Sequence, residues 1–506
     1  MRDGTRAAGI LLAASSLDGP WGIGTFGAEA RRWVDFLAEA GQTYWQILPL
    51  GPTGWGDSPY QSLSAFALSP YYIDPGLLCE EGLLSGAEAE NAARGSTGAD
   101  SERTDYAALY ADREPLLRKA HARFLARADG DAEYRRFLAE SPWLSGYALF
   151  MAIKQKYAGR AWLAWEKPLR CRDGAALRNA AHELAAEVEY HRFVQFLAFR
   201  QWRALKAYAN GRGVLVIGDM PIYVALDSAD TWAESDLFQL DAERRPLRVA
   251  GCPPDPFSET GQRWGNPLYD WDHNAGTGFA WWLERLRAAF RLYDVVRIDH
   301  FRGFESYYSI DAAARDARDG KWVKGPDAAF INAVKEALPG AAIIAEDLGY
   351  LTGEVRALLA RSGFPGMKIV QFAFDSREPG SRSYMPHNYE RNSVVYTGTH
   401  DNDTALGWFN TARREDTALA RDYLGLAPDS AEGNWAFIRA ALSSVADLAV
   451  IPLQDYLGLD SRARMNTPAT LGGSNWQWRM KRGAADAALA AKIRRLTEIS
   501  GRSLRA

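Results

Sequence analysis

Cysteine is scarce in this sequence. The chain of 506 residues contains three, Cys79, Cys171 and Cys252, and they lie far apart with no CxxC spacing. Such a set supports neither a disulfide framework nor a zinc ribbon. Unpaired, scattered cysteines fit a reducing compartment, and we expect a cytoplasmic protein.

Long apolar runs and a strong charge of one sign are also missing. No stretch reaches the roughly 18 apolar residues that a membrane span needs, so we expect no membrane contact. The formal net charge is −4, which gives no electrostatic reason to expect nucleic acid as a partner. With 47% hydrophobic and 24% charged residues, the composition is that of an ordinary globular protein with a large core.

Motifs of several common enzyme classes are absent. The segment HELAA at 182 to 186 ends in Ala186, where the zinc-protease pattern requires a second histidine. We find no GxSxG elbow, no P-loop, no dinucleotide fingerprint between a strand and a helix, and no calcium-type loop of oxygen ligands. We therefore expect neither a metal ion nor a cofactor.

Short apolar runs recur along the chain in eight places. Between most of them lie segments with helical periodicity, at 28–41, 279–293, 327–340 and 435–446. The runs begin at residues 9, 44, 214, 295, 343, 367, 393 and 448. Eight alternations of strand and helix predict an α/β fold, a (β/α)₈ TIM barrel, with residues 1–506 forming a single catalytic unit.

Two gaps between the predicted strands are long. Residues 52–190 have largely helical patterns, and we interpret them as an inserted helical subdomain. Residues 220–275 follow the third strand, are rich in Pro, Gly and Trp, and are too long for a plain connector. We interpret this second segment as an inserted region of functional loops at the top of the barrel.

Acidic residues stand where the predicted strands end. In barrel enzymes these strand ends meet at one mouth, where like charges repel and are costly unless they serve chemistry. Paired carboxylates without a histidine cluster suit the chemistry of glycosidic bonds. The strand-end residues are Asp219, Asp299, Glu346 with Asp347, His400 with Asp401, and Gln454 with Asp455.

The stretch VVRIDHFRGF at 295 to 304 illustrates this pattern. Side chains alternate across a strand, so Arg297 and Asp299 share one face. Taken alone, such an ion pair is as well explained by a structural role. The acids at the other strand ends favour a catalytic one.

Several longer motifs carry a resemblance to a known family. VRIDHFRG, IIAEDLG, TGTHDNDT, GDMPIYV and PPDPFSETGQRWGNPLYDW resemble those of the 4-α-glucanotransferases, also called amylomaltases or disproportionating enzymes, within the α-amylase-like barrel superfamily. The similarity runs from the segment at 9–24 to NWQWRM at 475–480. The short barrel motifs are shared with other α-amylase relatives, whereas GQRWGNPLYDW and SPYQSLSAFA, beginning at 58, point to this family itself.

The resemblance implies three catalytic residues. Asp299 would be the nucleophile, Glu346 the general acid/base and Asp401 the stabiliser of the transition state. A retaining reaction of this kind needs the nucleophile and the acid/base about 5 to 5.5 Å apart, which adjacent strand ends can supply. We expect Arg297 to lower the pKa of Asp299 and burial to raise the pKa of Glu346.

The resemblance also implies a substrate-binding site with two sides. On the donor side, Asp219, Arg297 and His400 would surround the sugar and Tyr60 would stack on it. On the acceptor side, the loop 251–270 would line a glucan groove with Phe257, Gln262, Trp264 and Asn266, and Asn475 lies in another family motif. The alternative role for Phe257 and Trp264 is packing inside the loop. The family usually has an aromatic residue where this chain has Pro256.

We expect α-1,4-glucans and malto-oligosaccharides as binding partners, and two other functions remain open. An α-1,4-glucan hydrolase of the amylase type would use the same three carboxylates, although the groove loop favours a sugar over water as acceptor. A non-catalytic glucan-binding barrel would be expected to lack at least one of them, and all three are present.

Overall fold

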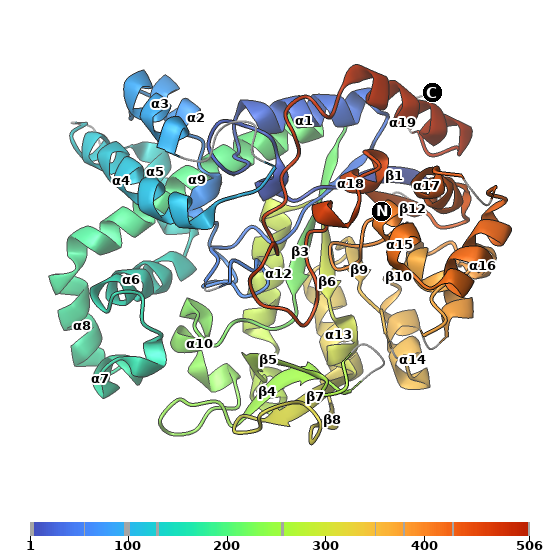
Figure 1. The fold of residues 1–506 in the computed structure, drawn as a ribbon. Coiled ribbons are helices and arrows are strands. Elements are labelled where there is room, and N and C mark those ends of the chain that lie inside the picture. Colours follow the sequence, from blue (N-terminus) through green and yellow to red (C-terminus); the bar gives the residue numbers. More distant parts are fainter. Residues whose placement is uncertain are drawn as a thin grey trace.

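The computed structural model describes residues 5–54, 56–95, 102–127, 131–254, 258–349, 351–377, 380–427 and 430–503. Figure 1 shows the ribbon, with helices surrounding a central set of strands. Pro256 and Phe257, the subject of two expectations above, lie outside the described residues.

Eight parallel strands form the central sheet, in the order β10-β11-β12-β1-β2-β3-β6-β9. All eight coincide with the predicted runs, and the predicted (β/α)₈ barrel is confirmed. Buried β-branched pairs such as Val394 and Val395 explain why these runs are strands. The strands are β1 (Ala7–Leu11), β2 (Tyr44–Gln46), β3 (Leu215–Pro221), β6 (Val295–Asp299), β9 (Ile343–Ala345), β10 (Gly366–Ile369), β11 (Ser393–Tyr396) and β12 (Leu448–Pro452).

The barrel closes between β9 and β10 with few hydrogen bonds. The Ala345 N–H donates to the Pro365 carbonyl over 3.0 Å. The Asp347 carboxylate adds a second link, because it accepts the Met367 N–H over 2.6 Å. A buried side chain thus takes the place of part of the strand ladder at this seam.

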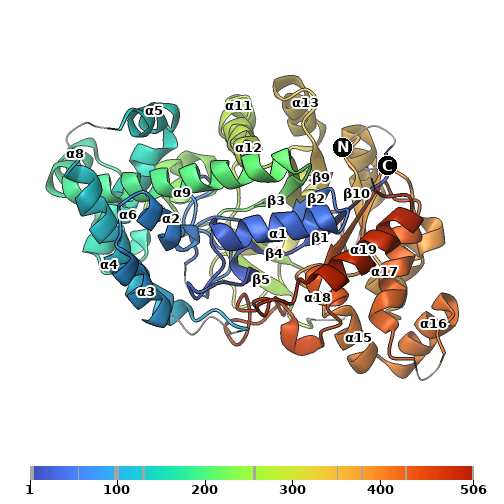
Figure 2. The ribbon, with the colours of Figure 1, turned by 90° about the horizontal axis from the view of Figure 1, so that it is seen from above.

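The outer helices cover the barrel with one apolar face each. In α1 (Ala28–Glu39) that face buries Trp33, Val34 and Leu37, and in α12 (Ala280–Leu292) it buries Trp282 and Leu286. The view from above shows α1, α9, α12 and α19 lying beside the strands (Figure 2). The other covering helices are α9 (Ala185–Gly211), α13 (Asp327–Ala337), α14 (Gly353–Ser362), α15 (Ala405–Thr411), α16 (Arg414–Leu424), α17 (Gly433–Ser443), α18 (Leu453–Tyr456) and α19 (Ala487–Ile499).

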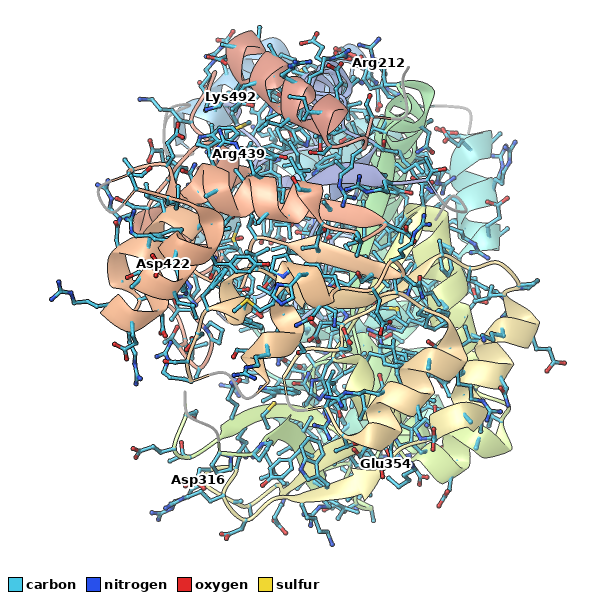
Figure 3. All side chains as sticks on the ribbon, turned by 90° about the vertical axis from the view of Figure 1, so that its right-hand side faces the viewer. Arg212, Asp316, Glu354, Asp422, Arg439 and Lys492 are labelled. Carbon is cyan, nitrogen blue, oxygen red and sulfur yellow. The ribbon has the colours of Figure 1, made fainter. Side chains whose placement is uncertain are left out.

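The outward faces of these helices carry charge. Glu354 on α14, Asp422 on α16 and Arg439 on α17 project away from the ribbon (Figure 3). No helix within the described residues is long and apolar enough to cross a membrane.

Between β2 and α9 the chain is mainly helical, and this part lies at the left of Figure 1. Asp105, Asp131 and Asp173 cap the N-termini of three of these helices by accepting backbone N–H groups. The division at 52–190 into a separate subdomain stays a prediction. The helices are α2 (Pro75–Glu80), α3 (Gly86–Gly95), α4 (Tyr106–Leu125), α5 (Ala132–Glu140), α6 (Trp143–Lys156), α7 (Lys167–Arg170) and α8 (Gly174–Glu183).

A second, antiparallel sheet lies below β3 and β6 in Figure 1, in the order β5-β4-β7-β8. Its strands β4 (Arg248–Cys252) and β5 (Gln262–Pro267) fall in the segment that we interpreted as loops, which also contains the short helices α10 (Ala229–Ala233) and α11 (Trp271–Gly276). The strands β7 (Ser306–Asp311) and β8 (Lys321–Lys324) follow β6. The segments after two neighbouring barrel strands therefore join in one sheet.

Candidate active site

A buried guanidinium joins two strand-end acids. In the register of β3 and β6, Asp219 lies beside Arg297. The Arg297 Nη1 donates to both Asp219 oxygens, over 2.6 and 2.7 Å, and to Asp299 Oδ1 over 3.0 Å. Because Arg297 is only 3% exposed, its charge is compensated by these two carboxylates rather than by water.

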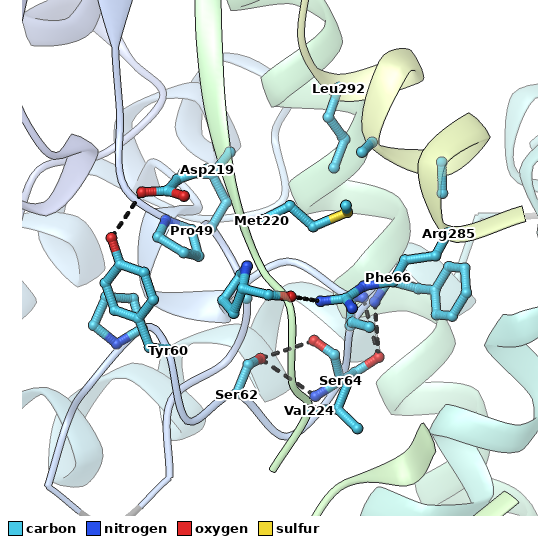
Figure 4. Close-up of a pocket in the computed structure, with 18 of the residues that line it drawn as sticks. Pro49, Tyr60, Ser62, Ser64, Phe66, Asp219, Met220, Val224, Arg285 and Leu292 are labelled. Atoms are coloured by element: carbon cyan, nitrogen blue, oxygen red, sulfur yellow. Dashed lines mark hydrogen bonds between the residues drawn. The ribbon is translucent and has the colours of Figure 1, made fainter. Parts of the chain in front are cut away.

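Tyr60 and His400 complete this side of the site. The Tyr60 hydroxyl donates to Asp219 Oδ2 over 2.8 Å, and both side chains line the cavity in Figure 4. The Tyr60 ring stacks on His400 with centroids 5.0 Å apart, and Trp476 lies against both rings. Tyr60, Asp219, Arg297, Asp299 and His400, all predicted for the donor site, are thus brought into contact.

Glu346 follows β9, next to β6, and the segment after Asp299 holds it in place. The Glu346 N–H donates to the Ile298 carbonyl over 3.0 Å, and the Phe301 N–H donates to the Glu346 carbonyl over 2.9 Å. Its side chain accepts two more backbone N–H groups, from His300 over 2.5 Å and from Leu348 over 3.1 Å. The carboxyl group is therefore fixed from both sides.

Asp401 stands after β11 with a half-exposed side chain. Its Oδ1 accepts the Asn466 Nδ2–H over 2.6 Å, its Oδ2 lies 3.4 Å from His400 Nε2, and its carbonyl accepts the Arg464 guanidinium over 2.5 Å. Sequence reasoning missed Arg464 and Asn466. They lie about 65 residues further along the chain, and no spacing relates them to Asp401.

Two other strand-end acids face away from this cluster. Asp347 links β9 to β10, as described above. Asp455 is buried and accepts the Thr397 hydroxyl and the Ala405 N–H. Their roles are structural, so the expected convergence of acids on the mouth is limited to Asp219, Asp299, Glu346 and Asp401.

The electrostatic environment gives the carboxyl groups of the site different pKa values. Burial, reinforced by the charge of Asp299, raises the pKa of Glu346 to about 7, as expected. Burial also raises the pKa of Asp299 to about 6, although Arg297 opposes the shift. Arg297 lowers this pKa as expected, but burial outweighs its effect and the charge of Asp219, which shares the guanidinium, adds to the rise.

The pKa of Asp401 is shifted in the opposite direction to those of Asp299 and Glu346. Burial opposes its ionisation, but His400 and then Asn466 outweigh that effect and lower its pKa to about 2. With 46% of its side chain exposed, water further favours the ionised form. The cluster therefore combines a readily ionised Asp401 with a Glu346 that burial and the charge of Asp299 help to keep protonated, a division of roles typical of acid/base pairs.

The predicted acceptor residues on β5 approach the same cluster. Trp264 donates its Nε1–H to Gln262 Oε1 over 3.0 Å, so the two side chains share a face. The Trp264 ring meets the His300 ring edge-on, with centroids 5.0 Å apart. Tyr223, which was not predicted, packs beside Trp264 with centroids 6.1 Å apart.

Two predicted binding residues use their amides within the protein. Asn266 is 4% exposed, donates to the Val224 carbonyl over 2.9 Å and accepts from Gln61 over 3.0 Å. Asn475 accepts the Thr467 N–H over 3.0 Å and donates to the Thr470 hydroxyl over 2.9 Å. Both amide groups are therefore occupied by hydrogen bonds within the protein. Phe257 lies outside the described residues.

Among the described residues, no group of three or more His, Cys, Asp or Glu side chains is arranged to hold a metal ion. The expectation of no metal ion and no cofactor stays a prediction.

Comparison with known proteins decides the family. A family model described as 4-alpha-glucanotransferase matches residues 12–485. The chain belongs to this family. A 4-alpha-glucanotransferase from Clostridium butyricum is 48% identical over 494 residues, covering 96% of this chain and 99% of that protein. Another, from Thermus thermophilus, is 48% identical over 507 residues, covering 98% of this chain and 99% of that protein.

Solved structures agree with this membership of the 4-alpha-glucanotransferase family. An amylomaltase from Streptococcus agalactiae in complex with acarbose superposes with a TM-score of 0.95 at 41% identity, covering 99% of this chain and all of that one. An amylomaltase from Corynebacterium glutamicum, at 18% identity and a TM-score of 0.76, shares the fold. The resemblance found in the sequence is therefore confirmed.

Proposed function

We propose that the protein is a 4-alpha-glucanotransferase that moves a segment of an α-1,4-glucan to the 4-hydroxyl of an acceptor glucan or glucose. One observation carries this proposal. Asp299, Glu346 and Asp401 lie at or after the ends of three barrel strands around one mouth, and Trp264 of β5 contacts the residue that follows Asp299.

The first step would use all three carboxyl groups. An Asp299 oxygen attacks the anomeric carbon while Glu346 gives its proton to the departing glycosidic oxygen, so one C–O bond forms as the other breaks. The product is a covalent glucosyl–enzyme and a free glucan end. Ionised Asp401 stabilises the positive charge that develops on the sugar ring.

The donor sugar would be held by the network behind Asp299. Asp219 and His400 hydrogen-bond its hydroxyls, and Arg297 keeps Asp219 and Asp299 in place. Tyr60, with one face packed on His400, offers its other surface to the sugar.

In the second step Glu346 acts as a base. It takes the proton from the acceptor 4-hydroxyl, whose oxygen attacks the anomeric carbon and releases Asp299, so the configuration is retained. Trp264 and Phe257 would stack on the acceptor and Gln262 would hydrogen-bond it, while Asn266 and Asn475 hold the walls of the groove. Water at about 55 M competes, so a millimolar sugar must gain on the order of 10⁴-fold through positioning.

Incubation with maltotriose and separation of the products by size tests this proposal. A ladder of longer glucans together with glucose is the expected result. Maltose and glucose without longer products would indicate the hydrolase, and unchanged maltotriose would indicate a binding protein. The comparisons favour neither alternative.

A further inference from the structure

The residue after Asp299 has an unusual backbone. His300 adopts φ 54° and ψ 49°, the left-handed conformation. A residue other than glycine adopts this conformation at a cost, and such outliers cluster at functional sites. The cost calls for a compensating contact at this position.

That contact is with Glu346. Two of its links to the turn, from the Glu346 N–H to the Ile298 carbonyl and from the Phe301 N–H to the Glu346 carbonyl, join main chain to main chain. The His300 N–H instead reaches the carboxyl group itself, over 2.5 Å to Oε2. The φ and ψ angles of His300 set the direction of the next peptide relative to its own, so the left-handed turn lets the successive N–H groups of His300 and Phe301 both reach Glu346, one at the carboxyl and one at the carbonyl.

The His300 ring is held by contacts with neighbouring rings and not by hydrogen bonds. Its Nε2 is buried and has no hydrogen-bond partner in the described part of the chain. Trp264 of β5 meets the ring edge-on at 5.0 Å, and Tyr223 lies 6.4 Å away. Gly303 lies nearby, since a Cβ added to it would come within 3.4 Å of both the ring carbon Cδ2 and the Tyr223 hydroxyl.

We infer that His300 is a positioning residue for Glu346: its left-handed backbone turns the successive N–H groups of His300 and Phe301 together onto Glu346, while its ring packs against Trp264 of the acceptor strand. This inference rests on the proposed function, because it needs Glu346 to be the acid/base. It assigns His300 no contact with substrate. The acid/base is then oriented from the acceptor side of the site as well as from the barrel.

The test compares His300→Gly, His300→Ala and His300→Val. All three lack the ring, but glycine adopts the left-handed conformation freely, alanine does so at a cost, and β-branched valine does so poorly. His300→Asn, which tolerates the same conformation, serves as the conservative variant. Thermal unfolding checks that each variant is folded, and the glycine–alanine pair carries the test if His300→Val does not fold.

Two donors separate a loss of acid catalysis from general damage. Maltotriose needs its leaving oxygen protonated, whereas an aryl maltoside with an acidic phenol does not. We expect the first step with maltotriose to fall by at least about tenfold more than that with the aryl donor in His300→Val, since general acid catalysis contributes about 10²–10⁴-fold. The selective loss should be smaller in His300→Ala, and small in His300→Gly and His300→Asn.

The pH profile gives a second readout. The His300 N–H favours the ionised carboxyl, so its loss should raise the pKa of Glu346 and move the alkaline limb of the first step to higher pH in His300→Val but not in His300→Gly. Equal losses with both donors, or the same profile in the glycine and valine variants, would overturn the positioning role. A wild-type enzyme inactive on both donors would overturn the proposed function itself, and the positioning role with it.

Discussion

The donor and acceptor sides of the site are built differently. On the donor side, Asp219, Arg297 and Asp299 sit on neighbouring barrel strands and are joined by hydrogen bonds of 2.6 to 3.0 Å. On the acceptor side, Trp264 and Gln262 belong to a separate antiparallel sheet and touch the donor side through ring contacts. In the proposed mechanism, barrel register fixes the catalytic groups, whereas the choice of acceptor depends on how the second sheet is placed against them.

The largest effect that we expect is on the donor side. Asp299→Asn removes the nucleophile, so transfer and hydrolysis should both fall by at least about 10³-fold while the fold is kept. Turnover of maltotriose by the purified variant measures this. Asp422→Asn, on the outer helix α16, is the matched control and should behave as wild type. Substantial transfer by Asp299→Asn, with contamination excluded, would remove Asp299 from this role.

The second largest effect is expected for Glu346→Gln, whose turnover of ordinary glucans should fall by about 10²–10⁴-fold. Its first step with an aryl donor should suffer much less, because a phenolate leaves without protonation. In the wild type, Asp299 must be ionised and Glu346 protonated, so the first step should slow below about pH 6 and above about pH 7. Glu346→Gln should lose the alkaline limb of this pH profile. Persistence of that limb would assign it to another group.

A smaller effect is expected on the acceptor side. Trp264→Ala should lower transfer several-fold more than hydrolysis, because the glucosyl–enzyme still forms but its sugar acceptor is held loosely. The measurement is the ratio of new glucan ends to transferred segments at one maltotriose concentration. Trp322→Ala, on the opposite edge strand β8 of the same sheet, is the control. An unchanged ratio in Trp264→Ala would show that β5 does not select the acceptor.

Chelation should affect neither side. The sequence has no calcium-type ligand loop, so prolonged treatment with a chelator should leave transfer and hydrolysis unchanged. Activity that is lost on chelation and restored by added calcium would contradict this expectation and favour the amylase alternative.

The sequence predicts the two sides unequally well. The strand ends at Asp219, Asp299, Glu346 and Asp401 follow from apolar runs that stop at acids, and the structure groups these residues. The sequence does not predict β4, because RVAGC is short and contains a glycine. Nor does it predict the contact of Asn466 with Asp401, which depends on how a distant loop folds back. The net pKa of Asp299 depends on burial and on the sharing of Arg297, and both are properties of the packed structure.

The second sheet is built from two chain segments that can be exchanged while the barrel strands are kept. Its strands come in two pairs, one after β3 and one after β6, and the barrel register of Asp219, Arg297 and Asp299 lies before each departure. Segments grafted after Pro221 and after Phe304 would leave the hydrogen-bonded donor cluster unaltered, although they would replace Tyr223 and Trp264, which pack against the His300 ring. Under the proposed function, exchanging these two segments together would change acceptor preference while the barrel strands and their catalytic groups are kept.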